Sequence, residues 1–408
     1  MKNNLKVGLV TPFPPSKTTL NEYGYHLAKH LANKEEIDDL QLFVEYLPDH
    51  EVAYEQQHEK QTIVPCWQFN KKSNPFKILK AVRANRPDVV IINLQFLLFG
   101  DSKIAAALGL MLPIFLRLYR FKVIVLLHNI MEEVDLDKAG FTKNPVLKTI
   151  YGLIGNVLTR LILKANLVGV TIEKYVDVLK TKYKKNNIVL LPHGSFEVPE
   201  EPDYLLPDGP YKIMTFGKFG TYKKVEVLIE AVEIVRSRTD LDMEIVVAGT
   251  DNPNVKGYLD GVKEQYKQVQ DLHFTGYVAE EDVPTIFRES AIVVFPYTST
   301  TGSSGVLHQA GSYGKAVILT NLGDLALLVK EEGYRGEFFE PEDKESLAQA
   351  IIKLLEDPKY RHEIEEANFR AASSLSMMDI ADWYLIHIEK LLGGYEPEPK
   401  PEEAVVAE

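Results

Sequence analysis

The sequence predicts an α/β protein with two Rossmann-like domains that face each other across a cleft. Three observations predict this fold class: short apolar runs, helical patterns between them, and an acidic, proline-rich interruption near residue 200. Runs that are apolar on both faces are typical of strands in a parallel sheet covered by helices. Because strands and helical patterns alternate, we expect βαβ units and a doubly wound sheet.

Each half of the chain contributes its own set of strand-length runs, rich in Val, Ile and Leu. The expected strands of the first half are 7–10, 40–44, 89–93, 122–127, 167–171 and 188–191. Those of the second half are 212–216, 244–248, 272–275, 291–296, 316–320 and 336–339. Helical patterns such as 225–236 and 347–355 lie between them. The repetition predicts one sheet per half.

The interruption at 195–210 has the composition of an interdomain linker, with clustered prolines and acidic residues. It divides the chain into a first domain, 1–197, and a second domain, 209–376. An amphipathic helix is expected at 377–392 and should pack back on the first domain. The tail 395–408 is rich in Pro and Glu and is expected to be disordered.

Composition excludes several classes of protein. The 408 residues suit two domains, and the net charge of −12 argues against nonspecific nucleic-acid binding. The only cysteine, Cys66, permits neither an internal disulfide nor a multi-cysteine metal site. A reducing cytoplasm fits this count, and the first residues do not resemble a signal peptide.

Two segments raise the question of membrane contact. The longest apolar run, 105–116, contains Pro113 and is shorter than the roughly 20 residues that a spanning helix needs. Either a buried helix or a surface helix over 105–120 that touches a membrane or a lipid acceptor explains it. The segment 142–187 is locally basic, which fits either solvated helix faces or a face that approaches anionic lipid or an anionic acceptor.

The most informative stretch is 291–324, in which a strand, a Gly/Ser/Thr loop and a helix over 306–313 follow one another. Free N–H groups and the helix dipole make such a helix start an anion site. The loop residues predicted to cradle a phosphate are Thr301, Gly302, Ser303, Ser304, Gly305 and Val306. The alternative is an ordinary helix cap made by one of the serine hydroxyls.

A pair of cations strengthens the phosphate interpretation. Gly217 and Lys218 follow the expected strand 212–216, and Lys223 precedes a helix a few residues later. Two positive charges beside a strand end can neutralise the charge that develops on a departing diphosphate. Lysines in loops are also commonly solvated, so each residue alone is a weak signal.

These motifs resemble the family 4 retaining glycosyltransferases, which have the GT-B fold. The segment Gly217-Lys218…Lys223…Leu228-Ile229-Glu230-Ala231 is similar to that family's Gly-Arg…Lys-Gly…Leu-Ile-Glu-Ala pattern. The stretches 301–310 and 314–318 together resemble the family's Glu-Gly-Phe-Gly…Glu-Ala…Gly-x-Pro-Val-Ile signature. The segment 274–278 resembles the family's Phe-Thr-Gly segment. Pro192-His193-Gly194 resembles the Pro-Asn-Gly that closes the family's first domain. The resemblance is strong in the second half and loose in the first.

The resemblance implies that 1–197 is the acceptor-side domain and that 209–376 is the nucleotide-sugar-binding domain. It also implies a role for each matched residue. Lys218 and Lys223 would bind the donor diphosphate, Gln309 the ribose, Tyr277 and Val278 the base, and His128 would lie near the reacting sugar. The family's two signature glutamates are replaced here by Thr301 and Gln309, and its arginine by Lys218, which lacks bidentate phosphate binding. His308 is expected only to pack its helix.

The sequence therefore predicts transfer of a hexose from a nucleoside-diphosphate sugar to a hydroxyl of a saccharide or lipid-linked acceptor, with retention. The replaced glutamates motivate a second hypothesis, a non-catalytic nucleotide-sugar-binding or scaffolding protein. A nucleotide-sugar epimerase is a weaker third, because no matching acid/base set is evident. No acidic metal cluster stands out, and neither metal, cofactor nor nucleic acid is expected. The expected location is the cytoplasm, with peripheral contact at the inner membrane face as an option.

Overall fold

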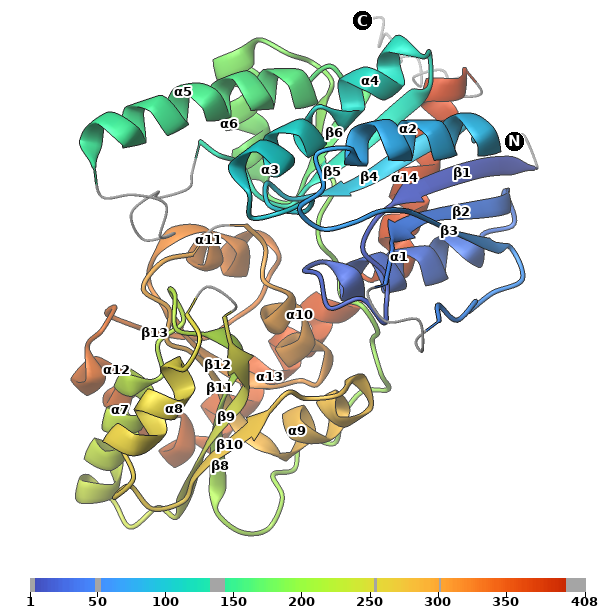
Figure 1. Cartoon of the computed structure of the whole chain (residues 1–408). Helices are drawn as coiled ribbons and strands as arrows, with labels where there is room; N and C mark the ends of the chain where they lie inside the picture. The colour runs from blue at the N-terminus through green and yellow to red at the C-terminus, as the bar shows by residue number, and fades with distance from the viewer. Residues whose placement is uncertain (1–3, 48–52, 133–143, 253–254, 301, 394–408) are drawn as a thin grey trace, which may run out of the picture.

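The computed structural model describes residues 4–47, 53–132, 144–252, 255–300 and 302–393. The chain forms two α/β domains, drawn one above the other in Figure 1. Each contains one sheet in which every pair of neighbouring strands is parallel. The predicted fold class, with two Rossmann-like domains, is confirmed.

The first domain has a seven-stranded sheet in the order β3-β2-β1-β4-β5-β6-β7. The strands are β1 (Leu5–Val10), β2 (Ile37–Glu45), β3 (Gln61–Trp67), β4 (Val89–Leu94), β5 (Lys122–Leu127), β6 (Leu167–Val170) and β7 (Ile188–Leu190). Alternate residues of a strand face opposite sides, so Val90 and Ile92 of β4 enter one core and Val89 and Ile91 another. The continuous apolar runs arise because helices cover both faces.

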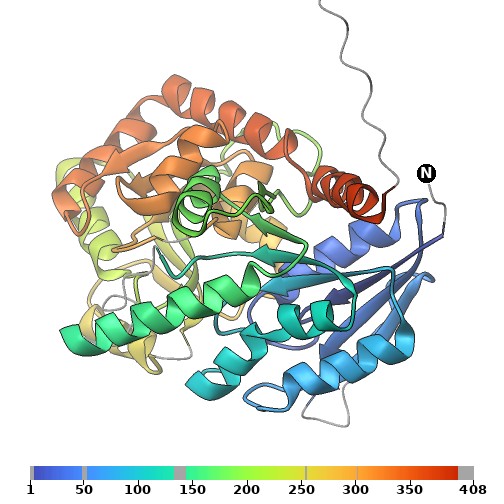
Figure 2. The ribbon, with the colours of Figure 1, turned by 90° about the horizontal axis from the view of Figure 1, so that it is seen from above.

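The two faces of this sheet carry different helices (Figures 1 and 2). One core includes residues of α1 (Asn21–Ala32) and α14 (Met377–Leu392). The other includes residues of α2 (Asn74–Asn85), α3 (Lys103–Leu110), α4 (Leu112–Leu118), α5 (Pro145–Ile162) and α6 (Glu173–Tyr183). None of the described helices is long and apolar enough to cross a bilayer.

The second domain has a six-stranded sheet in the order β10-β9-β8-β11-β12-β13. Its strands are β8 (Tyr211–Phe219), β9 (Met243–Asp251), β10 (Leu272–Gly276), β11 (Ser290–Phe295), β12 (Ala316–Thr320) and β13 (Glu337–Phe339). One face packs on α7 (Glu226–Arg238), α8 (Tyr258–Gln265) and α12 (Lys344–Glu356). The other packs on α9 (Val283–Glu289), α10 (Gly305–Ser312), α11 (Gly323–Glu331) and α13 (Pro358–Ser373).

The chain crosses between the domains twice, and the two crossings are hydrogen-bonded to each other. Ser195, at the start of the linker, donates to Leu375 and accepts from Met377, at 2.8 Å in both cases. A Ser376–Asp379 capping box then starts α14, which packs on α1 (Figure 2). The last helix of the sequence is therefore part of the first domain.

All twelve strand-like runs of the sequence are strands in the structure, whereas β3 was not predicted. Pro65 interrupts its pattern, but a proline is tolerated because β3 is an edge strand. The apolar run 105–116 forms two helices instead of one. α3 ends before Met111, and α4 begins after it with Pro113 in its first turn. The tail 395–408 lies outside the described residues.

Candidate active site between the two domains

The predicted site residues lie at the carboxyl ends of strands, most of them at or next to the point where the strand order of a sheet reverses. Chains leave β1 and β4 in opposite directions in the first domain, and β8 and β11 in the second. Open α/β sheets bind ligands at this switch point, beyond the carboxyl ends of the strands. Lys218 is near the end of β8, the 298–304 loop follows β11, and His128 follows β5. The carboxyl ends of the two sheets face each other, since a Cβ added to Gly302 would lie 2.7 Å from the carbonyl oxygen of His128.

Lys223 folds back over the end of β8. Gly217 has φ +137°, and a Cβ there would lie 2.7 Å from Nζ of Lys223, so glycine leaves the space that the amine occupies. The ammonium also lies 4.7 Å from the ring centroid of Tyr297. Burial, and then the charge of Lys218, lowers the pKa of Lys223 to about 8. Among the described residues, no carboxylate forms an ion pair with Lys223, which suits a lysine that awaits an anionic ligand.

The start of α10 offers free amides, as predicted, but fewer than predicted. Ser304 caps the helix by accepting from the Leu307 amide, which leaves the Gly305 and Val306 amides in the uncapped first turn. The Gly302 amide is already used, because it donates to Tyr175 Oη at 2.7 Å and to Asp324 Oδ2 at 3.1 Å. Gly302 thus shapes the loop, with φ +82°, and does not supply its amide to a phosphate.

Ser303 and His308 form a structural pair inside the second domain. The Ser303 hydroxyl lies 3.1 Å from Nε2 of His308, whose Nδ1 lies 2.9 Å from the Tyr334 hydroxyl. His308 is 2% exposed and stacks on His193, with ring centroids 5.0 Å apart. Its packing role agrees with what the sequence indicated.

His128 is held by a chain of hydrogen bonds across three strand ends. Asn93 donates from Nδ2 to Thr11 Oγ1, so its Oδ1 is the acceptor that faces His128 Nε2 at 2.6 Å. This network assigns the Nε2–H tautomer and leaves Nδ1 as a lone pair. Burial, and then the neighbouring His193, holds the pKa of His128 well below its usual range. His128 is therefore neutral at physiological pH.

Glu22, at the start of α1, links the first domain to the second domain's site. Its Oε1 accepts from Gln309 Nε2 at 3.1 Å across the cleft. Burial raises the pKa of Glu22 to about 7, with Glu280 also raising it and Lys218 and Gln309 opposing. A carboxyl so placed between cations and polar groups of both domains is the kind of perturbed group that gathers at functional sites.

A second connection between the domains is centred on Asp324. Its buried carboxylate accepts from the Tyr175 hydroxyl at 2.6 Å and lies 3.2 Å from Lys174 Nζ, both on α6 of the first domain. Because the same carboxylate also accepts from the Gly302 amide, α6, α11 and the phosphate loop share one acceptor. This network fixes the loop relative to the first domain.

Two of the remaining predicted residues, Tyr277 and Val278, follow the edge strand β10. Tyr277 follows β10 and is 77% exposed, whereas Val278 packs against the core of the second domain. The exposed ring is available to stack on a flat ligand. Thr301 lies outside the described residues.

Sequence reasoning missed Glu22, Asp324 and Tyr175. Asn21 and Glu22 follow a loop after the first strand, which is the position where Rossmann-like sheets bind ligands, so their place in the pattern was a usable signal. Asp324 and Tyr175 carried no such signal, because their pairing depends on how the two domains are placed.

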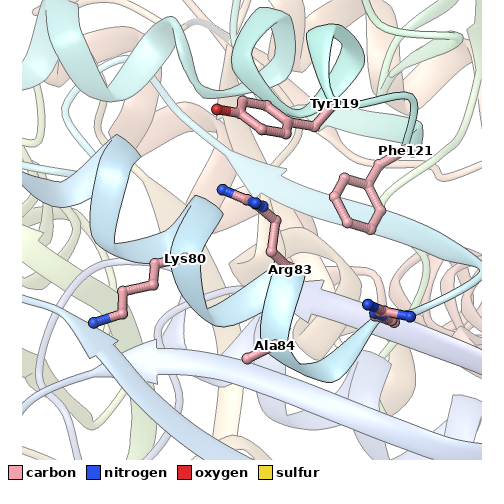
Figure 3. A pocket seen from close by; sticks show the side chains of 6 residues that line it. Lys80, Arg83, Ala84, Tyr119 and Phe121 are labelled. Carbon is pink, nitrogen blue, oxygen red and sulfur yellow. The ribbon is translucent and has the colours of Figure 1, made fainter.

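A separate cavity of about 470 Å³ lies at the opposite, amino-terminal edge of the first sheet. Figure 3 shows Lys80, Arg83 and Ala84 on one helix, facing Tyr119 and Phe121. The guanidinium of Arg83 lies 4.7 Å from the ring centroid of Tyr119. Three cations line this cavity, since Arg86 completes it. It is remote from the cleft and is not part of the candidate active site.

Comparisons with known proteins agree with the fold and with the second domain's motifs. A family model described as glycosyl transferases group 1 matches residues 210–357. No curated protein matches the chain. Sucrose-phosphate synthase from Thermosynechococcus elongatus superposes with a TM-score of 0.72 at 16% identity, covering 96% of this chain and 100% of that one.

Two further solved structures are similar over nearly their whole lengths. Anabaena HepE in complex with UDP and glucose has a TM-score of 0.66 at 15% identity, covering 94% of this chain and 99% of that one. WaaG, a glycosyltransferase involved in lipopolysaccharide biosynthesis, has a TM-score of 0.64 at 13% identity, covering 95% and 100%. The protein thus has the GT-B fold. Its second domain is similar to the group 1 glycosyltransferases.

Proposed function

We propose that this protein is a glycosyltransferase that moves a hexose from a nucleoside-diphosphate sugar to a hydroxyl acceptor, with retention. The observation that carries the proposal is the half-buried Lys223 beside Lys218, at the switch point of a domain similar to group 1 glycosyltransferases. Lys223 has no carboxylate partner among the described residues. An ammonium buried without a carboxylate costs stability, and an anionic ligand offsets that cost.

The proposed reaction breaks the bond between the sugar C1 and the diphosphate oxygen and joins C1 to the acceptor oxygen. The acceptor proton leaves to the diphosphate. Lys218, Lys223 and the free amides of Gly305 and Val306 stabilise the charge that develops on the diphosphate. The carbonyl or Nδ1 of neutral His128 accepts a hydrogen bond from a sugar hydroxyl.

The nucleoside is proposed to lie along the second domain. Gln309 contacts the ribose, and Tyr277 and Val278 contact the base. Gln309 uses one N–H to bind Glu22 and keeps a second N–H and its oxygen for a ribose hydroxyl. The acceptor enters from the first domain. HepE is solved with UDP-glucose, so UDP-glucose is the first donor to test.

A donor panel separates this proposal from a non-catalytic donor-binding protein. Melting temperature is measured with UDP, GDP, ADP and dTDP, since a ligand of the folded state raises it. The nucleoside diphosphate that raises the melting temperature most identifies the base. Nucleotide sugars with that base are then assayed for transfer and hydrolysis. Catalysis predicts release of nucleoside diphosphate that depends on acceptor, at a rate that falls in Lys223→Met. Binding without release, with extracts of membrane lipid and saccharide as acceptors, contradicts the enzyme proposal.

We also propose that the acceptor is reached at an anionic membrane surface, through the layer formed by α2, α3, α4 and α5. These four helices contain seven Lys or Arg residues and no Asp or Glu, although the protein's net charge is −12. α5 presents an exposed apolar stripe at helical spacing, made of Val146, Leu147, Ile150, Leu153, Ile154 and Val157. Basic helices with exposed apolar faces bind anionic interfaces.

The cationic cavity of Figure 3 belongs to the same layer, where Phe76, Leu118 and Tyr119 are also exposed. Co-sedimentation with phosphatidylglycerol vesicles, but not with phosphatidylcholine vesicles, is the expected result. Leu153→Ser should weaken vesicle binding. Ile386→Ser, the equivalent change at an exposed position of α14, should not. Equal binding of both variants would remove α5 from the proposal. The location that we propose is the cytoplasm, at the inner membrane face.

A further inference from the structure

Three ligand-type side chains from both domains meet at the mouth of the cleft. Glu22 and His26 lie one turn apart on α1, and Glu280 belongs to the short 3₁₀ helix Glu280–Asp282 of the second domain. One ligand atom from each lies within 4.8 Å of the other two. Residues spaced i and i+4 lie on one face of a helix, so α1 alone presents two of the three.

His26 supplies an independent reason to look for a ligand here. The side chain is 4% exposed, yet neither ring nitrogen has a hydrogen-bond partner among the residues that the structure describes. A buried polar group without a partner is costly and is rare in folded proteins. The ring is clamped by stacking on Phe196, at 4.5 Å between centroids and 7° between planes. Its Nε2 is directed at Glu280, whose Oε1 is 3.5 Å away.

That separation is the one expected for two ligands of the same metal ion. Ligand atoms about 2.1 Å from a tetrahedral centre are about 3.4 Å apart. Metal-binding histidines commonly point their other nitrogen at a carboxylate, and His26 Nδ1 lies 3.9 Å from Oε1 of Glu197. Lys29 holds Glu197 in place through an ion pair.

We propose that Glu22, His26 Nε2 and Glu280 bind one divalent transition-metal ion, and that Glu197 orients His26. An imidazole with two carboxylates suits Mn²⁺ or Zn²⁺ better than Mg²⁺ or Ca²⁺, which prefer oxygen ligands alone. Glu22 accepts from Gln309 through Oε1 and retains its other oxygen for the metal. Three protein ligands leave a coordination position open to water or to an anionic ligand.

The consequence is a metal ion that joins the two domains. Two ligands come from the first domain and one from the second, so binding favours the closed arrangement over one in which the domains separate. The charge of Lys218 also acts on Glu22, which places the ion beside the proposed diphosphate position. The metal site does not depend on glycosyl transfer, because its ligation is measured without donor or acceptor.

The test is titration calorimetry of the full chain, stripped with chelator, with MnCl₂ and ZnCl₂, and with MgCl₂ for comparison. We expect one saturable site for Mn²⁺ or Zn²⁺ and at least tenfold weaker binding of Mg²⁺. Glu280→Gln should weaken binding at least tenfold, and Glu197→Gln by about 10- to 100-fold. Glu280 is exposed, so its variant keeps the fold.

Glu281→Gln is the matched control, because it removes the same charge from the next residue of the same 3₁₀ helix. It should bind as the wild type does. A nitrogen modulation in the electron spin echo of bound Mn²⁺, lost in His26→Gln, identifies the imidazole. No saturable binding in the wild type, or equal weakening by Glu280→Gln and Glu281→Gln, overturns the proposal. If the wild-type protein binds the metal but shows no transfer activity, only the proposed function is contradicted.

Discussion

Replacing Lys223, whose side chain is half-buried, by Met should make the ligand-free protein more stable. Burial lowers the pKa of Lys223 to about 8, from 10.5 for an ordinary lysine. Each tenfold change in proton affinity corresponds to about 1.4 kcal/mol, so the folded protein carries a penalty on the order of 3 kcal/mol at neutral pH. Methionine fills a similar volume without the charge, and the variant should recover up to that amount.

The sign of the pH dependence is fixed by the same pKa. Below about pH 8, Lys223 is protonated in both the folded and the unfolded chain, and the penalty is present in full. Between about 8 and 10.5 the unfolded chain binds more protons, so stability rises with pH. This rise should be absent from Lys223→Met. The difference in melting temperature between variant and wild type should therefore shrink as pH rises from 7 to 10.

Donor binding should change in the opposite direction. A hydrogen bond to a charged group contributes about 1.5–3 kcal/mol, so loss of the ammonium should weaken nucleoside diphosphate binding about ten- to a hundredfold. Wild-type affinity should also fall above pH 8, as Lys223 loses its proton. Thermal shift with and without the diphosphate measures both effects on one sample.

Lys224→Met is the matched control, because it removes one charge from the adjacent residue. The Lys224 amine donates to the Gly220 carbonyl at 3.1 Å and lies over the Tyr258 ring, whereas the Lys223 amine lies beside Gly217 and Tyr297. It should not stabilise the ligand-free protein, and it should leave diphosphate affinity within about twofold. If Lys223→Met destabilises the ligand-free protein, or if both variants lose the same affinity for the diphosphate, Lys223 is an ordinary structural lysine and does not bind the diphosphate.

Three further predictions concern other parts of the molecule. Tyr175→Phe should destabilise the protein by about 1.5–3 kcal/mol and raise the KM for the nucleotide sugar, because Asp324 loses a hydrogen bond that fixes the 302–305 loop. The control is Tyr266→Phe, which loses a 2.7 Å hydrogen bond to Glu230 within one domain and should change only stability. Burial, and then Glu331, raises the pKa of Glu332 to about 8, so Glu332→Gln should stabilise the protein at pH 8 and leave it unchanged at pH 4; equal melting-temperature changes at both pH values contradict this. Chemical-shift titration of His128 should show a neutral ring throughout pH 5.5–8, whereas a midpoint near 6.5 would refute the buried network.

The inner strands were predictable from the sequence because they are buried on both faces and appear as unbroken apolar runs. The edge strands β7, β10 and β13 were also located from short apolar runs. The edge strand β3 was missed because Pro65 removes its periodic signal. The break at Met111 was missed because a proline two residues later is as compatible with a helix start as with a kink.

The site was predictable only where it is local in sequence. Lys218, Lys223 and the α10 start follow strand ends of one domain, so the strand pattern places them together. Glu22, Asp324 and Tyr175 act on partners in the other domain, and no spacing along the chain encodes such a distance. Gly302 shows the same limit, because a small residue before a helix predicts a free amide and cannot reveal that a tyrosine of the first domain already binds it.

Gln309 fits its surroundings where a glutamate would not. The sequence resemblance implies a glutamate at this position, and a glutamate there would lie against Glu22. Burial and Glu280 already raise the pKa of Glu22 to about 7, so a third carboxylate would increase the repulsion. The amide instead donates to Glu22. The carboxylate beside Gln309 is therefore Glu22, which belongs to the first domain. The Gln309–Glu22 pair forms only when both domains are in place.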